Sequence, residues 1–447
     1  MRMTSHQKIA ARAAFAGLVL LCGQAFAAIP IQRWTQASGA TIYLVESPTL
    51  PMVDVRLEFD AGGRRDPADK AGRASIAASM TSKGIEARDG RPALDENQLG
   101  EAWADLGASF GGGASSDRMS FTMRSLTYPD VLPKAIDLAS RQMGEPSFPD
   151  AIWQRDRQRM AASIREANTK PATLAQRAFA SAVFGAHPYG YEVTEATIGR
   201  IGVADMREAY QLVQACRAKV TIVGAVNRAQ ADAMVTAILG RLPTAGKCEP
   251  LPVIAEVTPL TAESVKAIPF ASAQAHVMIG QPGYKRNDPD YFAMLVGNYV
   301  LGGGGLVSRL SDEVREKRGL SYSVYSYFSP GMHAGAFTIG LQTRPDQAAQ
   351  AVKIARETMA GYVASGPTEV ELKAAKDNLI GGFPLLIDSN RKLLDNVANI
   401  AWYDLPLDYL DVWTSRVQRV TASEIKAAFG RKLHPDRMVI VTVGGAV

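Results

Sequence analysis

The chain has 447 residues, of which 47% are hydrophobic and 21% are charged, and a chain of this length is expected to form at least two globular domains. The formal net charge is +5, but the segment 1–27 holds three basic and no acidic side chains, so the rest carries +2. This nearly neutral charge removes any strong electrostatic case for binding nucleic acid or an anionic membrane.

The segment 1–27 is typical of an export signal. Basic residues at 2–12 precede an apolar run at 13–21, and Ala25-Phe26-Ala27 fits the small-x-small cleavage pattern. The run is shorter than the roughly 20 residues that span a bilayer, and the bulky leucine before Cys22 does not suit a lipidated N-terminus. We therefore expect a periplasmic or secreted protein without a stable membrane anchor; an uncleaved amphipathic N-terminus is the alternative.

The predicted elements then occur twice in the same order. The first series has strands at 40–45 and 53–60, a helix at 70–82, a strand at 118–125, paired helices and a strand at 219–224. The second has a strand at 275–280, a helix at 290–301, a strand at 335–342, paired helices and a strand at 438–444. The order predicts that one unit is repeated.

Local strings support a duplication. Phe121-Thr122-Met123 recurs as Phe337-Thr338-Ile339, and Thr127-Tyr128-Pro129-Asp130 recurs as Thr343-Arg344-Pro345-Asp346, both at an offset of 216 positions. Runs of strands followed by runs of helices favour an α+β fold.

The expected architecture is two homologous, clam-like domains, each a mostly antiparallel sheet covered by helices. We place the domains at 28–243 and 270–447, joined by a proline-rich linker at 244–269.

Two cysteines follow the predicted signal, Cys216 and Cys248. Without a nearby histidine they do not form a zinc motif. An oxidising compartment permits a disulfide between them, but two buried thiols fit the sequence almost as well.

Several strings resemble the pitrilysin/insulinase family of zinc peptidases, which carry an inverted H-x-x-E-H motif. They are residues 72–84, His187-Pro188-Tyr189-Gly190, residues 301–309 and, most specifically, Arg315-Glu-Lys-Arg-Gly-Leu-Ser-Tyr322. The resemblance covers nearly the whole predicted mature chain. It is closest to the shorter members, such as bacterial two-subunit peptidases and the mitochondrial processing peptidase, and implies the same fold.

The resemblance also implies that this chain has lost the zinc site. The metal positions fall on Ser75 and Ser79, the base on Ala78, and the further glutamate on Ala162 or Ser163. Hydroxyl and methyl groups do not replace imidazole and carboxylate ligands. The histidines at 187, 276, 333 and 434 are too widely spaced for a helical zinc motif. We therefore expect no metal on this chain.

The second half keeps the other part of the family's site. The resemblance implies that Arg315 and Tyr322, seven positions apart, reach toward a zinc centre, where the phenol stabilises an oxyanion and the guanidinium binds substrate carbonyls. The spacing alone also fits an alternative, in which Arg315 caps the C-terminus of a helix and Tyr322 is a buried aromatic residue of a strand. The resemblance implies that Gly302, Gly303, Gly304 and Gly305 contact substrate, as the corresponding glycine-rich segment does in related non-catalytic subunits. A flexible turn between helices accounts for the four glycines equally well.

The main hypothesis is a non-zinc subunit, inactive alone, that forms a heterodimeric endopeptidase with a homologous chain carrying H-x-x-E-H. Zinc would sit on that partner, and the substrate would be a peptide. The alternative is a catalytically inactive scaffold or peptide-binding protein of the same fold. A metal-free hydrolase lacks a nucleophile–base pair in this sequence.

Overall fold

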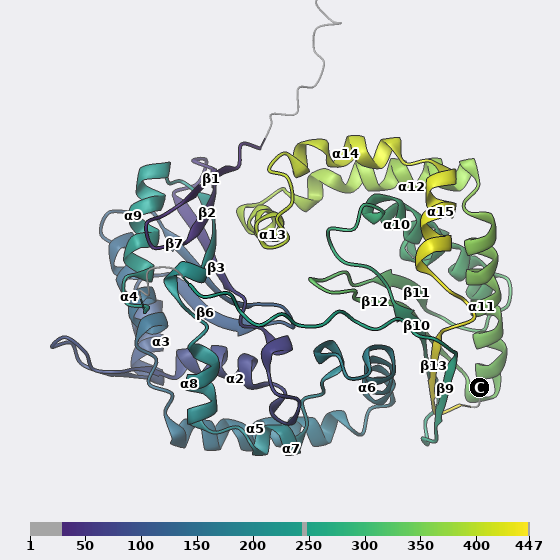
Figure 1. The fold of residues 1–447 in the computed structure, drawn as a ribbon, viewed down its shortest axis with the longest axis horizontal. Coiled ribbons are helices and arrows are strands. Elements are labelled where there is room, and N and C mark those ends of the chain that lie inside the picture. Colours follow the sequence, from purple (N-terminus) through teal and green to yellow (C-terminus); the bar gives the residue numbers. More distant parts are fainter. Residues whose placement is uncertain (1–28, 244–247, 446–447) are drawn as a thin grey trace, which may run out of the picture.

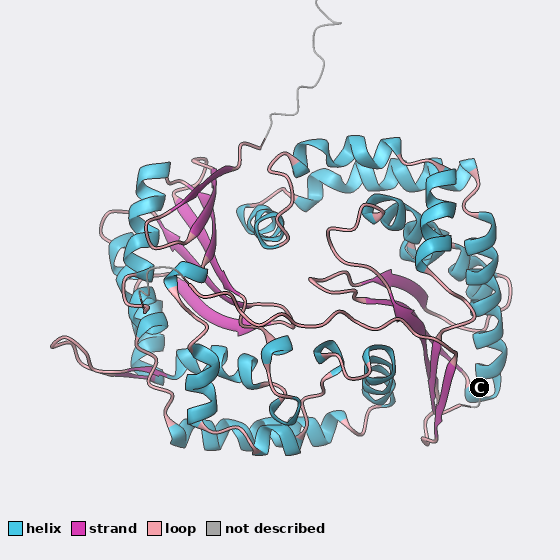
Figure 2. Cartoon of the chain, viewed as in Figure 1, coloured by secondary structure: helices cyan, strands magenta, loops and turns pink. Residues whose placement is uncertain are grey.

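The computed structural model describes residues 29–243 and 248–445 of the chain, so the predicted signal at 1–27 lies outside the described residues. Two halves face each other, each with one large sheet and with most helices on the outer side of that sheet (Figure 1, Figure 2). This arrangement confirms the predicted α+β class with two similar halves.

The sheet of the first half has the strand order β1-β2-β8-β3-β7-β6, and only β2 and β8 run parallel among its described strands. Its strands are β1 (Gln32–Thr35), β2 (Thr41–Glu46), β3 (Met52–Phe59), β6 (Ser109–Ala114), β7 (Met119–Leu126) and β8 (Lys219–Gly224). Side chains of β7 alternate between buried and part-exposed positions, as expected for a strand with unlike faces. The short strands β4 (Gly84–Ile85) and β5 (Leu94–Asp95) form a separate pair.

The helices of the first half are α2 (Arg73–Met80), α3 (Glu96–Asp105), α4 (Leu132–Gly144), α5 (Asp150–Ala167), α6 (Pro171–Phe184), α7 (Glu195–Gly199), α8 (Val203–Tyr210) and α9 (Arg228–Leu239). Their starts follow local sequence rules. Asp95 and Asn227 accept hydrogen bonds from backbone N–H groups in the first turns of α3 and α9, and proline opens α6.

The sheet of the second half has the order β11-β12-β10-β13-β9, with β13 and β9 parallel. Its strands are β9 (Ser264–Ile268), β10 (Ala275–Pro282), β11 (Val324–Phe328), β12 (Ala336–Thr343) and β13 (Val439–Val443). The helices are α10 (Tyr291–Asn298), α11 (Ala348–Ser365), α12 (Glu369–Gly382), α13 (Asn390–Trp402), α14 (Tyr409–Arg419) and α15 (Ala422–Lys432).

The two halves exchange one helix each (Figure 1). Helix α6 of the first half packs on β10 and β13, and α13 of the second half packs on β8 and β3. The offset of 216 positions carries the range of α6 onto most of α13, so the exchanged helices are equivalent in the duplication. Each half therefore completes the core of the other.

Both exchanged helices pack through apolar side chains. Helix α6 buries Phe179 and Val183 in an apolar cluster with the second sheet. Helix α13 buries Val397 in an apolar cluster that includes Val223 of the first sheet. Two ion pairs add to this contact: Arg56 pairs with Asp395 at 2.5 Å, and Lys219 pairs with Asp404, just after the helix, at 2.9 Å.

The segment predicted as a linker, 244–269, differs from that expectation at its end. Residues 248–263 form no helix or strand, but 264–268 form β9 at the edge of the second sheet. The alternation Ser264-Val-Lys-Ala-Ile268 suits a strand, and β13 supplies the backbone partners.

A disulfide joins Cys216 to Cys248, with 5.8 Å between their Cα atoms. The sequence left this pairing open, and the fold brings the two cysteines together where the segment between the halves begins. Among the described residues, no helix has the length and apolar character needed to cross a membrane.

Candidate functional site

Tyr322 projects from a short turn that is anchored on both sides. Ser311–Glu316 form a π-helical segment, and the chain then reverses at Gly319, whose φ is +60° and whose N–H donates to Arg315 O at 2.8 Å. Thr343 Oγ1 donates a hydrogen bond to Leu320 O at 2.6 Å, and Oγ of the buried Ser321 donates to Gln342 O at 2.6 Å. The anchored neighbours leave Tyr322 pointing outward.

The reversal brings Arg315 and Tyr322 together. The guanidinium lies 4.8 Å from the centre of the Tyr322 ring, within the range of a cation–π contact. Tyr322 is 84% exposed, so it is not the buried strand aromatic of the alternative interpretation. The pair thus presents a phenol and a guanidinium at the surface, although the fold needs neither for its core.

The four glycines precede this segment and have unequal roles in packing. Gly302 is buried, and a Cβ on it would lie 2.6 Å from the Ser326 backbone nitrogen, so β11 requires glycine there. Gly303 and Gly305 are exposed, and Gly305 has a φ of +63° with open space around it. Packing accounts for Gly302 and also limits Gly303, where a Cβ would lie 2.8 Å from Asn298 Nδ2, but it does not explain Gly305.

The residues predicted to occupy the degenerate zinc positions lie on helices of the first half. Ser75 and Ser79 share the exposed face of α2, and Ser79 Oγ donates to Ile76 O at 2.9 Å. Ala78 is fully buried, and Ser163 is exposed on α5. Within the described ranges, no group of three or more His, Cys, Asp or Glu side chains is arranged to hold a metal ion. These residues do not fit zinc, because none of the four positions offers a ligand.

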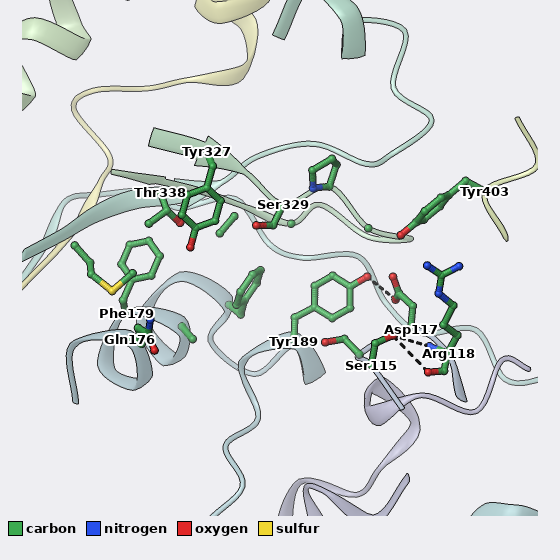
Figure 3. A pocket seen from close by; sticks show the side chains of 18 residues that line it. Ser115, Asp117, Arg118, Gln176, Phe179, Tyr189, Tyr327, Ser329, Thr338 and Tyr403 are labelled. Carbon is green, nitrogen blue, oxygen red and sulfur yellow. Dashed lines mark hydrogen bonds between the residues drawn. The ribbon is translucent and has the colours of Figure 1, made fainter. Parts of the chain in front are cut away.

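A cavity of about 550 Å³ lies between the halves (Figure 3). The turn between β6 and β7 contributes Asp117 and Arg118, helix α6 contributes Phe179, and the second sheet contributes Tyr327 and Thr338. Tyr189 also lines it and donates to Asp117 at 2.5 Å. The cavity combines an apolar side with a row of hydroxyl groups.

A buried carboxylate lies next to this cavity. Glu58 on β3 is 2.9 Å from Arg118, which in turn donates to Asn399 of α13 at 2.7 Å. Burial raises the pKa of Glu58 to about 7, although the positive charges of Arg118, Arg56 and Lys219 oppose the shift. The contact between α13 and the first sheet therefore contains a group that titrates near neutral pH.

The structure also joins two histidines that the sequence left apart. The rings of His187 and His333, from opposite halves, have centroids 4.9 Å apart, and both residues are buried. No local sequence pattern predicts this contact, because 146 positions separate the two residues in the chain.

Two family patterns match consecutive stretches of the chain, and the boundary between them falls inside the first half, before α8. The sequence pattern of the family described as "Insulinase (Peptidase family M16)" matches residues 41–197, and that described as "Peptidase M16 inactive domain" matches residues 200–379.

The chain is similar in sequence and fold to a peptidase M16 inactive domain from Pseudomonas fluorescens, with 33% identity, a TM-score of 0.86, and coverage of 93% of this chain and 98% of that one. It is 26% identical over 422 residues to the Helicobacter pylori protein named "Non-peptidase homolog YmxG", covering 91% of this chain and 92% of the relative. The periplasmic protease PqqL of Escherichia coli shares the fold, with 18% identity and a TM-score of 0.78 over 93% of this chain and 45% of that protein.

Proposed function

This chain belongs to peptidase family M16 and carries its inactive-type domain, and we propose that it is the non-zinc subunit of a heterodimeric zinc endopeptidase. Its partner would be a homologous chain with an intact H-x-x-E-H motif, which would supply the metal and the carboxylate base. This chain would supply Arg315 and Tyr322.

The observation that carries the proposal is the exposed Arg315–Tyr322 pair. A tyrosine with 84% exposure adds little to the stability of its own chain, so its position calls for a role outside the fold. Peptide hydrolysis develops negative charge on the carbonyl oxygen, and a phenol O–H directed at that oxygen lowers the barrier. Arg315 offers a fixed fork of donors for neighbouring carbonyl groups and holds the phenol ring through its cation–π contact.

The α2 face without ligands supports a division of labour between two chains. Ser75 and Ser79 occupy the exposed i and i+4 positions where imidazoles would bind the metal, and they offer only hydroxyl groups. A chain that lacks the zinc ligands but keeps the Arg/Tyr pair forms a complete active site only beside a chain that has the zinc ligands. Gly303 and Gly305 would contact the substrate backbone where the subunits meet.

Export to the periplasm or the medium is part of the proposal. The disulfide between Cys216 and Cys248 suits an oxidising compartment, and the signal-like N-terminal sequence suits transport. The periplasmic protease PqqL of Escherichia coli, which shares the fold, supports that location.

The second candidate is a peptide-binding protein or scaffold without a catalytic partner. The interdomain cavity favours it, because about 550 Å³ lined by Phe179, Tyr327 and Thr338 would accommodate side chains of a bound peptide. This candidate does not require Arg315 and Tyr322.

The deciding experiment is gentle purification of the tagged chain from its native cell envelope, followed by mass spectrometry of the proteins that accompany it. A stoichiometric partner with H-x-x-E-H, and chelator-sensitive peptidase activity in the complex alone, are the expected results. A chain that purifies alone or with itself, while still binding peptides, would favour the second candidate.

A further inference from the structure

The contact between His187 and His333 lies at the junction of three segments. His187 begins the short helix Pro188–Gly190 of the first half, and its Nδ1 accepts from Tyr189 N at 3.1 Å. His333 lies in the loop 329–335 between β11 and β12, with Nε2 3.4 Å from the Arg64 guanidinium and Nδ1 3.4 Å from Glu256. Glu256 belongs to the segment that connects the halves.

Backbone N–H groups of the loop 329–335 bind the first half and the segment that connects the halves. Met332 N donates to Asp117 at 3.0 Å, His333 N donates to the Tyr189 hydroxyl at 3.2 Å, and Ala334 N donates to Glu256 at 2.9 Å. The fit is close, since a Cβ on Gly331 would lie 2.6 Å from the Tyr189 hydroxyl oxygen. Each bond crosses from the second half to another segment, so the loop acts as a clasp.

We propose that the packing of His187 against His333 makes this clasp acid-sensitive, so that mild acid releases the loop 329–335 from the first half. In the structure each ring presents one nitrogen to a donor: His187 Nδ1 faces the Tyr189 N–H, and His333 Nε2 faces Arg64. Only a neutral imidazole accepts a hydrogen bond. A second proton on the His187 ring would set its Nδ1–H against the Tyr189 N–H, so that two donors face each other.

The surrounding charges decide how the clasp responds. Arg64 faces both rings and is itself paired with Asp60 and Asp117, at 2.7 and 3.3 Å. On the other side Glu256 faces His333, but Lys285 already pairs with that carboxylate. Burial pushes the pKa of Glu256 up, and the bonds from Lys285, Ala334 N and Val257 N outweigh burial and lower it to about 2. Glu256 therefore keeps its charge throughout the range in which histidine titrates.

The direction of the pH effect follows from His187. Burial, then the neighbouring His333, lowers the pKa of His187 below its ordinary value of 6.5. A lowered pKa means that the clasped state binds the proton less readily than the open state, so the clasp is complete above pH 6.5 and weakens as the pH falls below it. Asp117, Tyr189 and Gly331 also line the interdomain cavity, so release of the loop would widen the access to it.

Hydrogen–deuterium exchange of the intact mature protein tests the proposal. After correction for intrinsic rates, we expect the protection of the amides of Met332, His333 and Ala334 to fall between pH 7.5 and 5.5, by at most about tenfold, because one histidine with an ordinary pKa in the open state contributes no more than a factor of ten per pH unit. The double variant His187→Asn/His333→Gln replaces both imidazoles with amides, whose oxygens accept hydrogen bonds but do not titrate. Its loop should show the same amide protection at both pH values. Matching protection of the wild-type loop at both pH values would overturn the proposal, whether or not the variant folds.

Two further variants separate the clasp from general acid effects. His434→Asn removes a histidine outside the clasp, and the wild-type pH response should persist in it. Gly331→Ala obstructs the docked loop sterically, and its loop should exchange rapidly at both pH values. A pH response that survives unchanged in the double variant would assign the effect to other groups and reject the clasp.

Discussion

The Arg315 guanidinium lies 4.8 Å from the centre of the Tyr322 ring, and this contact holds an 84% exposed tyrosine in a defined place. The turn at Gly319 and the anchors at Leu320 and Ser321 explain why two residues seven positions apart meet. Substitutions in this surface pair can test the proposed function, because they should affect activity far more than folding.

Replacing Tyr322 with phenylalanine removes the hydroxyl and keeps the ring against which Arg315 packs. In the proposed complex with a zinc-bearing subunit, we expect kcat to fall by about a hundredfold, the loss typical of one oxyanion donor, with no change in the affinity between subunits. Steady-state kinetics and sedimentation measure the two quantities. Tyr128→Phe, at a 48% exposed tyrosine of the first half, is the matched control. Unchanged turnover would remove Tyr322 from the mechanism.

The exposed face of α2 should accept a metal once it has ligands. Ser75→His together with Ser79→His places two imidazoles one helical turn apart, and we expect Zn²⁺ to bind at least about tenfold more tightly than to either single variant. Titration calorimetry measures the affinities. Addition of Ser163→Glu should tighten binding further if α5 supplies the third ligand. Equal affinities in the single and double variants would show that the two positions do not converge.

Glu58 should make stability depend on pH. Its pKa is about 7 in the folded chain, against an ordinary value of 4.5, so its stabilising contribution is complete below pH 4.5 and is lost as the pH rises through 7. Relative to wild type, Glu58→Gln should gain about 3 kcal/mol in free energy of unfolding between pH 4 and pH 8. Urea unfolding at several pH values measures this difference. The exposed Glu369→Gln serves as control, and a pH-independent difference for Glu58→Gln would contradict the assignment.

The disulfide should stabilise the chain by limiting its unfolded state. Cys216 and Cys248 are 32 positions apart, and closing a loop of that size contributes up to about 4 kcal/mol in the chain-entropy account. We expect Cys216→Ser/Cys248→Ser to unfold at lower urea concentration than the oxidised wild type. Reductant should lower the stability of the wild type and leave the variant unchanged. Equal midpoints for the two oxidised proteins would argue against the bridge in solution.

Much of the fold was predictable because its signals are local or repeated. The strand predicted at 335–342 is β12 at Ala336–Thr343, and the strand predicted at 118–125 is β7 at Met119–Leu126. The strings that recur at an offset of 216 positions predicted two similar halves, and the string from Arg315 to Tyr322 indicated the peptidase family. Alternation, capping and turn residues act over a few positions, so the sequence displays them directly.

Only the tertiary structure decided how the halves hold each other. No local pattern states that α6 and α13 change places, that Cys216 meets Cys248, or that His187 meets His333. These contacts join segments far apart in the chain, and their energy comes from burying both partners at once. By itself the sequence determined the repeated fold and the family, and it predicted the loss of the zinc ligands. The long-range packing decided the exposed Tyr322, the buried histidine pair and the cavity between the halves.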